Sequence, residues 1–310
     1  MNIYVSGSLA YDRIMDFPGK FADHILPEKI HMINVCFMVN GIVEKFGGTA
    51  GNIAFNLALL DEQSIVLASA GKDFDAYEIW MRQHNLPLAG IRRIEDEFTA
   101  GAYITTDLSD NQITGFNPGA MKHPSLYQFN NEKPEETFAI ISPGNFEDML
   151  SFSRFYKERK IKYIFDPGQQ IPVLSKDHLL EMITGSEILI VNDYELQMIE
   201  NAVDLTKPEL LNLTKTVIVT MGEIGSLVCK SHQEINIPVA RAKKVVDPTG
   251  AGDAYRAGLI KGLISQQDLQ VAAQMGSTIA SFAVECYGTQ EHHFTADEFQ
   301  DRYQENFNRP

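Results

Sequence analysis

Short apolar, β-branched runs alternate with longer segments of helical periodicity along most of the chain. The runs that we expect to form strands are residues 3–5, 64–68, 138–141, 163–165, 187–191 and 216–220. Apolar residues between them recur every three to four positions, most clearly in 53–58 and 271–283. This alternation is typical of βαβ units, so it predicts an α/β protein with a central, mostly parallel sheet covered by helices.

Two stretches depart from the alternation. Residues 12–45 are mixed in character, whereas residues 98–117 contain two expected strands around a turn at 108–111. We expect these stretches to pair as a small β lid above the carboxyl edge of the large sheet. The large domain would then comprise 1–11, 46–97 and 118–310, although two consecutive domains are the alternative.

Charge and cysteine content restrict the partners and the compartment. The 41 acidic residues outnumber the 26 basic ones and give a formal charge of -15, which repels both nucleic acid and anionic lipid. An anionic small substrate would need backbone amides, a helix N-terminus or a divalent cation to offset this charge. The three cysteines form no CxxC pair, and we find neither a signal peptide nor an apolar run long enough to span a membrane. These features predict a cytoplasmic protein.

The segment 247–254, DPTGAGDA, carries the strongest chemical signal. Its proline and glycines delay the next helix, so residues 250–253 should form a turn whose amides face an anion at the helix N-terminus. Asp253 lies beside that anion site, where it could accept a hydroxyl proton during phosphoryl transfer or simply cap the helix. A Rossmann turn is disfavoured because Tyr255 occupies the third glycine position, and no Walker phosphate loop is present.

A second glycine turn, GGTAGN at 47–52, opens the helical segment 53–58. Together the two turns resemble the signatures of the ribokinase-like, or pfkB, family of sugar and nucleoside kinases. The segments NDYE at 192–195 and VTMGEIG at 219–225 are also similar to family elements. The resemblance implies the ribokinase-like fold, a three-layer α/β/α sandwich with a small β-sheet lid. It further implies ATP and Mg²⁺ as cofactors and leaves open a monovalent cation.

The family resemblance also implies roles for individual residues. Asp253 would be the catalytic base, and the amides of Gly250, Ala251 and Gly252 would stabilise the transferred phosphoryl group. Asn192 and Glu195 would hold Mg²⁺ through water. The residues implied in ATP binding are Asn192, Thr220, Gly222 and Gly225.

Within the family, segments 6–12, 17–21, 118–121, 166–170 and 288–291 most resemble bacterial adenosine kinases. This resemblance implies phosphorylation of adenosine to AMP. The implied substrate-binding residues are Ser8, Asp12, Gly48, Asn52, Phe116, Gln169 and Gln170. Two positions depart from the subgroup, in which the purine is stacked between aromatic rings: Ala102 replaces one of these aromatics, and Cys36 replaces a serine. Tyr103 should point to the opposite face of its strand.

Several alternatives remain compatible with the sequence. A sugar kinase for ribose, fructose or a related ketose would use the same polar residues, and guanosine or inosine could replace adenosine. A binding protein that has lost catalysis is a third alternative, although Asp253 and Glu195 are both retained. Analogy with related kinases suggests a homodimer formed through the lid. We expect His292 and His293 to lie in a solvated segment rather than in a metal cluster.

Overall fold

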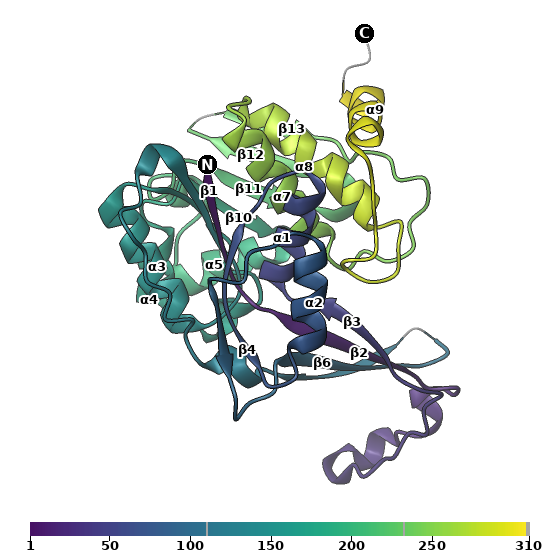
Figure 1. The fold of residues 1–310 in the computed structure, drawn as a ribbon. Helices are drawn as coiled ribbons and strands as arrows, with labels where there is room; N and C mark the ends of the chain where they lie inside the picture. Colours follow the sequence, from purple (N-terminus) through teal and green to yellow (C-terminus); the bar gives the residue numbers. More distant parts are fainter. Residues whose placement is uncertain (110, 232, 308–310) are drawn as a thin grey trace.

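A nine-stranded sheet forms the centre of the computed structural model, which describes residues 1–109, 111–231 and 233–307 (Figure 1). In spatial order its strands are β13 (Gln233–Ile237), β12 (Ser226–Lys230), β11 (Val217–Thr220), β10 (Ile188–Asn192), β9 (Lys162–Phe165), β8 (Thr137–Ile141), β1 (Asn2–Ser6), β4 (Ile65–Gly71) and β5 (Ile91–Ile94). Neighbouring strands are parallel from β11 to β5, whereas β12 and β13 pair antiparallel at the other edge. Each expected strand coincides with one of these, and the mostly parallel sheet is confirmed.

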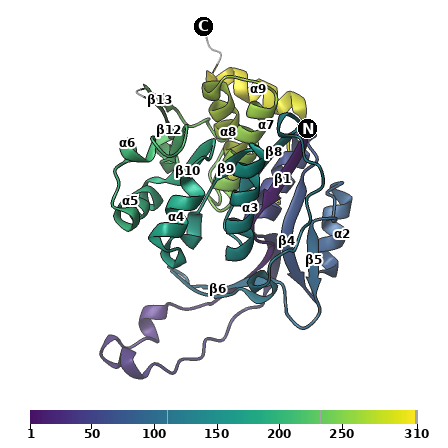
Figure 2. The ribbon, with the colours of Figure 1, turned by 90° about the vertical axis from the view of Figure 1, so that its left-hand side faces the viewer.

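Helices cover both faces of this sheet (Figure 2). One face packs against α1 (Thr49–Leu59), α2 (Asp75–Gln83), α7 (Ala251–Ile264) and α8 (Leu269–Ala283), with α9 (Ala296–Phe307) beside α8. The other face packs against α3 (Phe146–Arg159), α4 (Lys176–Ile183), α5 (Asp193–Val203) and α6 (Lys207–Leu210). Strand β1 shows the division: Ile3 and Val5 belong to the first core, and Tyr4 belongs to the second. None of the helices in the described ranges has the length and apolar character to cross a membrane.

A second, four-stranded sheet extends from one edge of the molecule (Figure 1). Its strands, in spatial order, are β3 (Val43–Gly47), β2 (Ala10–Asp16), β6 (Ala100–Thr106) and β7 (Gln112–Asn117). The β6–β7 hairpin matches the expected strand pair, and Asp110 in its expected turn lies outside the described residues. The sequence did not identify β2 and β3, which flank the short helices η1 (Phe21–Asp23) and η2 (Pro27–Met32). We use the term small sheet for β3, β2, β6 and β7.

Candidate active site

Two adjoining cavities lie where the small sheet meets the carboxyl ends of the large sheet's strands. The larger, of about 530 Å³, is lined by Ser8, Ala10, Asp12, Gly48, Thr49, Asn52, Ala102, Thr114, Phe116, Met121, Pro143, Gln169, Gln170, Thr249, Gly250, Asp253 and Thr289. The smaller, of about 300 Å³, is lined by Thr49, Pro143, Asp166, Gly168, Gln169, Asn192, Glu195, Thr220, Gly250, Gly252, Asp253 and Arg256. Asp253 and Gly250 line both cavities, so the predicted base lies at their junction.

The N-terminus of α7 is formed by the predicted glycine turn. Gly250 is the N-cap residue with φ of 78°, and a Cβ atom there would approach the side chain of Thr289 to 3.0 Å. No side chain caps the helix, so the first-turn amides of Gly252 and Asp253 keep donors without intrahelical partners. These amides, together with the helix dipole, can bind an oxyanion in the smaller cavity.

The carboxylate of Asp253 is partly buried between the two cavities. Its Oδ2 accepts a hydrogen bond of 2.8 Å from Nδ2 of Asn52, which lies in the first turns of α1. Burial raises the pKa of Asp253 to about 7, and the nearby carboxylates of Asp166 and Asp12 act in the same direction. Arg256 and the Asn52 hydrogen bond oppose this rise. A carboxylate with this pKa can accept a proton near neutral pH.

A buried ion pair lies behind the anion site. Arg256 donates from Nη2 to Oδ1 of Asp166 at 2.8 Å and from Nε to Oδ2 of the same carboxylate. Its Nη1 also donates to the carbonyl oxygen of Gly252 at 2.9 Å, which ties the guanidinium to the glycine turn. The two side chains are only 8% and 3% exposed. Neither residue was predicted from the sequence to take part in the site; the one available signal was an arginine within an otherwise apolar stretch of α7.

The N-terminus of α1 forms the opposite wall of the larger cavity. Gly48, with φ of 90°, allows this approach because a Cβ atom would lie 2.5 Å from the carbonyl oxygen of Ser8. The hydroxyl of Ser8 accepts a hydrogen bond of 3.0 Å from the amide of Thr49. Asp12 projects into the same cavity from β2, and burial together with Asp247 raises its pKa to about 6. Ser8, Asp12, Gly48 and Asn52 are therefore gathered as the sequence predicted.

The small sheet contributes an apolar wall to the larger cavity. Ala102 and Phe116 are direct cross-strand partners, and Asp12 is the neighbour of Ala102 on β2. The expectation that positions 102 and 116 would lie on opposite sides of a purine is therefore wrong, because cross-strand partners lie side by side on one face. Tyr103 points to the other face, where its ring lies 5.3 Å from the guanidinium carbon of Arg13.

The neighbouring glutamines contribute differently to this cavity. Gln169 and Gln170 belong to η5 (Gly168–Val173), directly after Asp166. Gln169 lines both cavities, whereas Gln170 lines the larger one alone. The Gln170 side chain is tied down, because its Nε2 donates to the carbonyl oxygen of Gly144 at 3.0 Å. Both residues therefore line the larger cavity, and their role at the boundary of the substrate stays a prediction.

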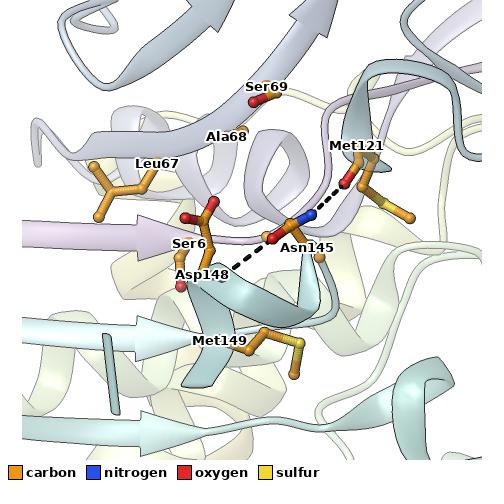
Figure 3. Close-up of a pocket in the computed structure, with 10 residues that line it drawn as sticks. Ser6, Leu67, Ala68, Ser69, Met121, Asn145, Asp148 and Met149 are labelled. Carbon is orange, nitrogen blue, oxygen red and sulfur yellow. Dashed lines mark hydrogen bonds between the residues drawn. The ribbon is translucent and has the colours of Figure 1, made fainter. Parts of the chain in front are cut away.

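A short segment between the two sheets also contributes to the larger cavity. Met121 lies in η3 (Gly119–Lys122), and its carbonyl oxygen accepts a hydrogen bond of 3.0 Å from Nδ2 of Asn145 (Figure 3). Asn145 also caps α3, since its Oδ1 accepts from the amide of Asp148 at 3.2 Å. A cavity of about 10 Å³ beside these residues has room for roughly one water molecule. The position of Met121 is thereby fixed to the large sheet.

The polar residues of the smaller cavity include the predicted metal-binding pair. Asn192 Oδ1 accepts from the amide of Glu195 at 2.7 Å, and Glu195 Oε2 accepts from the amide of Asn192 at 2.8 Å. The pair thus forms a capping box at the start of α5. Burial raises the pKa of Glu195. These oxygen atoms suit a hydrated Mg²⁺ ion, which keeps several waters and takes few direct protein ligands.

The other residues that the sequence predicted to bind ATP do not all line the smaller cavity. Thr220 lines the smaller cavity, but Gly222 and Gly225 lie beyond it in the turn after β11. Across the described residues, no three His, Cys, Asp or Glu side chains are grouped to hold a metal ion by themselves.

The expectation that His292 lies in a solvated segment is wrong. Its side chain belongs to a residue that is only 3% exposed, and its Nε2 pairs with Asn56 Oδ1 at 2.8 Å.

Comparisons with known proteins identify the family and the fold of this chain. Residues 21–295 match the model of the pfkB family carbohydrate kinase. The nucleoside kinase of Methanocaldococcus jannaschii is 33% identical over 89% of this chain and 91% of its own length. A Burkholderia thailandensis nucleoside kinase in complex with inosine superposes with a TM-score of 0.87 at 32% identity, covering 99% of this chain and 98% of that one. Its complex with ADP-inosine gives a TM-score of 0.84 at 33% identity, with 99% and 96% covered.

Proposed function

Because the chain belongs to the pfkB family of carbohydrate kinases and is therefore a phosphotransferase with an alcohol acceptor, we propose that it phosphorylates the primary 5′-hydroxyl of a ribonucleoside with ATP. Its ribokinase-like fold, predicted from the sequence, is confirmed by the similar structures. The observation that carries the proposal is the position of Asp253 at the junction of the two cavities. We propose adenosine as the substrate, giving AMP, and inosine as the first nucleoside to test beside it.

In the proposed reaction the nucleoside occupies the larger cavity. Asp12 and the free N–H of Asn52 would bind ribose hydroxyls, while Phe116 would contact the base. The 5′-hydroxyl would then face Asp253, whose carboxylate takes its proton as the new O–P bond forms. The bond between the transferred phosphorus and the departing oxygen of ADP breaks in the same step.

The smaller cavity would hold the phosphates of ATP. The amides of Gly250, Gly252 and Asp253 would stabilise the charge on the phosphoryl group during transfer, whereas the amide of Ala251, also a predicted donor, donates to the carbonyl oxygen of Pro248 at 3.2 Å. Asn192 and Glu195 would hold Mg²⁺ through its water ligands, and the ion would neutralise phosphate charge. The amides and the Mg²⁺ ion are needed to attract the phosphates, because the chain as a whole carries a formal charge of -15, which repels them.

We also propose that residues 12–45 and 98–117, which contain most of the small sheet, act as a lid. Closure would exclude water and limit hydrolysis of ATP. All residues of β7 are exposed, which supports pairing of two chains through this sheet. Sedimentation of the wild type and of a variant with a charge on the outer face of β7 would test this dimer.

A coupled assay of ADP release with adenosine, inosine, guanosine, ribose and fructose tests the proposed function. We expect a kcat/KM for at least one purine nucleoside that exceeds the values for both sugars by tenfold or more. Turnover of ribose or fructose alone would replace the proposal by a sugar kinase. Calorimetric binding of a nucleoside without ADP release would show a binding role instead.

A further inference from the structure

A chain of side-chain hydrogen bonds, buried at its centre and partly buried at both ends, leads from α2 to Asp253. Trp80 Nε1 donates to Gln290 Oε1 at 2.9 Å, and Gln290 Nε2 donates to Asn52 Oδ1 at 3.0 Å. Asn52 Nδ2 then donates to Asp253 Oδ2 at 2.8 Å. Gln290 and Asn52 are 3% and 4% exposed, so solvent does not offer these amides alternative partners.

The chain has only one consistent direction. An indole N–H is a donor and never an acceptor, so the atom of Gln290 that faces Trp80 must be its oxygen. The Gln290 amide nitrogen therefore points the other way, toward Asn52 and toward the hydroxyl of Tyr77 at 2.6 Å. Tyr77 uses its own proton for the carbonyl oxygen of Gly47 at 2.9 Å, so this hydroxyl accepts from Gln290.

The orientation of Gln290 in turn fixes that of Asn52. A side-chain amide can present either its oxygen or its nitrogen to a neighbour, and only the surrounding hydrogen bonds decide between the two. Because Gln290 supplies an N–H, the Asn52 oxygen faces Gln290 and its nitrogen faces Asp253. The reversed amide would place an oxygen against the carboxylate and an N–H against an N–H.

We propose that Gln290, itself oriented by Trp80, is a positioning residue that keeps an N–H donor of Asn52 on the carboxylate of the catalytic base. The inference rests on the proposed function for its catalytic meaning, but the hydrogen-bond chain can be tested without turnover. Without Gln290, only Asp253 itself orients the Asn52 amide, so the N–H donor on the carboxylate is held less firmly. The Asn52 hydrogen bond lowers the pKa of Asp253, so its loss raises that pKa.

Other charged groups also shift the pKa of Asp253, and their charges must stay the same in every variant that is compared. Arg256 on α7 favours its charged form, whereas Asp166 after β9 and Asp12 on β2 disfavour it. Burial raises the pKa of the Tyr77 hydroxyl on α2, and the carboxylates of Asp12 and Asp253 lie close enough to add to this rise. Neutral substitutions at positions 80 and 290 change none of these charges, so a shift in the titration of Asp253 reports on the Asn52 amide.

The variant Gln290→Met preserves side-chain length but removes all three hydrogen bonds of the amide, to Trp80, Asn52 and Tyr77. Trp80→Phe removes the indole N–H at the far end of the chain together with part of the ring that packs on Phe46 and Phe55, and leaves the Gln290 amide in place. His292→Leu is the matched control: it removes an equally buried hydrogen bond to α1, at Asn56, one helical turn from Asn52. All three should lower the melting temperature, so thermal stability alone cannot separate positioning from packing.

Two measurements distinguish the positioning of Asn52 from a general loss of packing. The first is the titration of Asp253 followed by NMR in protein labelled with ¹³C at the aspartate carboxyl groups, where the signal missing from Asp253→Asn identifies this residue. In this experiment Gln290→Met should raise the titration midpoint of Asp253 by about one pH unit. Trp80→Phe should give a smaller rise in the same direction, and His292→Leu should give none. The acid limb of kcat/KM should move by the same amounts, with rates recovering at high pH.

An unchanged midpoint in Gln290→Met, or a midpoint in the control that moves equally, would overturn the proposal. If Gln290→Met does not fold, an unchanged midpoint in Trp80→Phe overturns it instead. Failure of the proposed function is distinguishable, because the carboxyl titration needs no turnover. A shifted midpoint in a protein that phosphorylates no nucleoside would support the positioning role and refute the nucleoside kinase proposal.

Discussion

Asn52 Nδ2 donates a 2.8 Å hydrogen bond to Asp253 Oδ2 across a sequence separation of 201 residues. The bond joins the first turn of α7 to the beginning of α1, so each glycine turn supplies one partner. The two helices also pack against one another along the same face of the large sheet. Two motifs that are distant in the chain therefore form one site, with a proton acceptor at its centre.

The assignment of Asp253 as the base predicts a large loss of turnover in Asp253→Asn. An amide has nearly the same shape but cannot accept the hydroxyl proton, so kcat should fall by roughly 10²- to 10⁴-fold. Because burial raises the pKa of Asp253, its ionised form opposes folding above neutral pH. The variant should therefore be more stable than the wild type at pH 8, as thermal unfolding can measure. Turnover within tenfold of the wild type would rule out this base.

The same group predicts the pH dependence of the wild type. Catalysis needs the charged carboxylate, and the pKa of Asp253 is about 7 in the free protein. Below that pH, kcat/KM should fall about tenfold per unit, and above it kcat/KM should level off. A rate profile between pH 5 and 9 checks this. An acid limb centred near pH 4 would mean that the carboxylate is far better solvated than the structure indicates.

The buried pair of Arg256 and Asp166 predicts a strong effect on stability. Asp166→Asn leaves the guanidinium without a counter-charge in a buried position, so the free energy of unfolding should fall by about 3–5 kcal/mol. The double variant Asp166→Asn with Arg256→Met removes both charges and should recover much of this loss. Urea unfolding of the two single variants and the double variant gives the coupling between them. Additive losses would show that the pair contributes no specific interaction.

The capping box predicts that Glu195→Gln removes the negative charge near the proposed Mg²⁺ site without destabilising the start of α5. Glutamine can still accept the hydrogen bond from the amide of Asn192, so the start of α5 should be retained. Loss of the negative charge should raise the Mg²⁺ concentration for half-maximal rate several-fold, with little change in melting temperature. Titration of Mg²⁺ at fixed ATP measures this effect. An unchanged Mg²⁺ requirement would place the ion away from Glu195.

The apolar wall of the larger cavity predicts a gain from Ala102→Phe. A ring at this position would lie beside Phe116 and extend the surface offered to a base, which should tighten purine nucleoside binding by about fivefold. Calorimetric titration with adenosine and inosine measures the change. Tyr103→Phe is the control, because position 103 points to the opposite face of β6. Equal affinities in the wild type and Ala102→Phe would show that the base contacts another wall.

Local sequence patterns predicted six of the nine strands of the large sheet, all but β5, β12 and β13, and the two glycine turns, because the causes of these features are local. A buried parallel strand is a short apolar run, and a left-handed residue such as Gly250 favours glycine whatever surrounds it. Strands β2 and β3 escaped detection because the small sheet leaves them half-exposed, without a continuous apolar run or a clear alternation. Their pairing partners, and the parallel contact of β2 with β6, are set by tertiary packing.

The contacts that tune Asp253 could not be predicted in the same way. Arg256 and Asp166 are 90 residues apart, and Gln290 and Asn52 are 238 residues apart. Neither pair has a periodic signature, since each arises from the folding of separate elements onto one sheet edge. The side-by-side arrangement of Ala102 and Phe116 likewise depends on strand register, which a motif match does not specify.

The path of the chain between the two sheets restricts how this protein can be recombined with its relatives. The chain crosses between the sheets at β1–β2, β3–α1, β5–β6 and β7–η3, and all but the third of these junctions carry residues that line the larger cavity. A chimera that exchanges the small sheet must therefore be cut next to Ser8, Gly48 and Met121. Grafting that sheet from another kinase would import part of the donor's selectivity along with it.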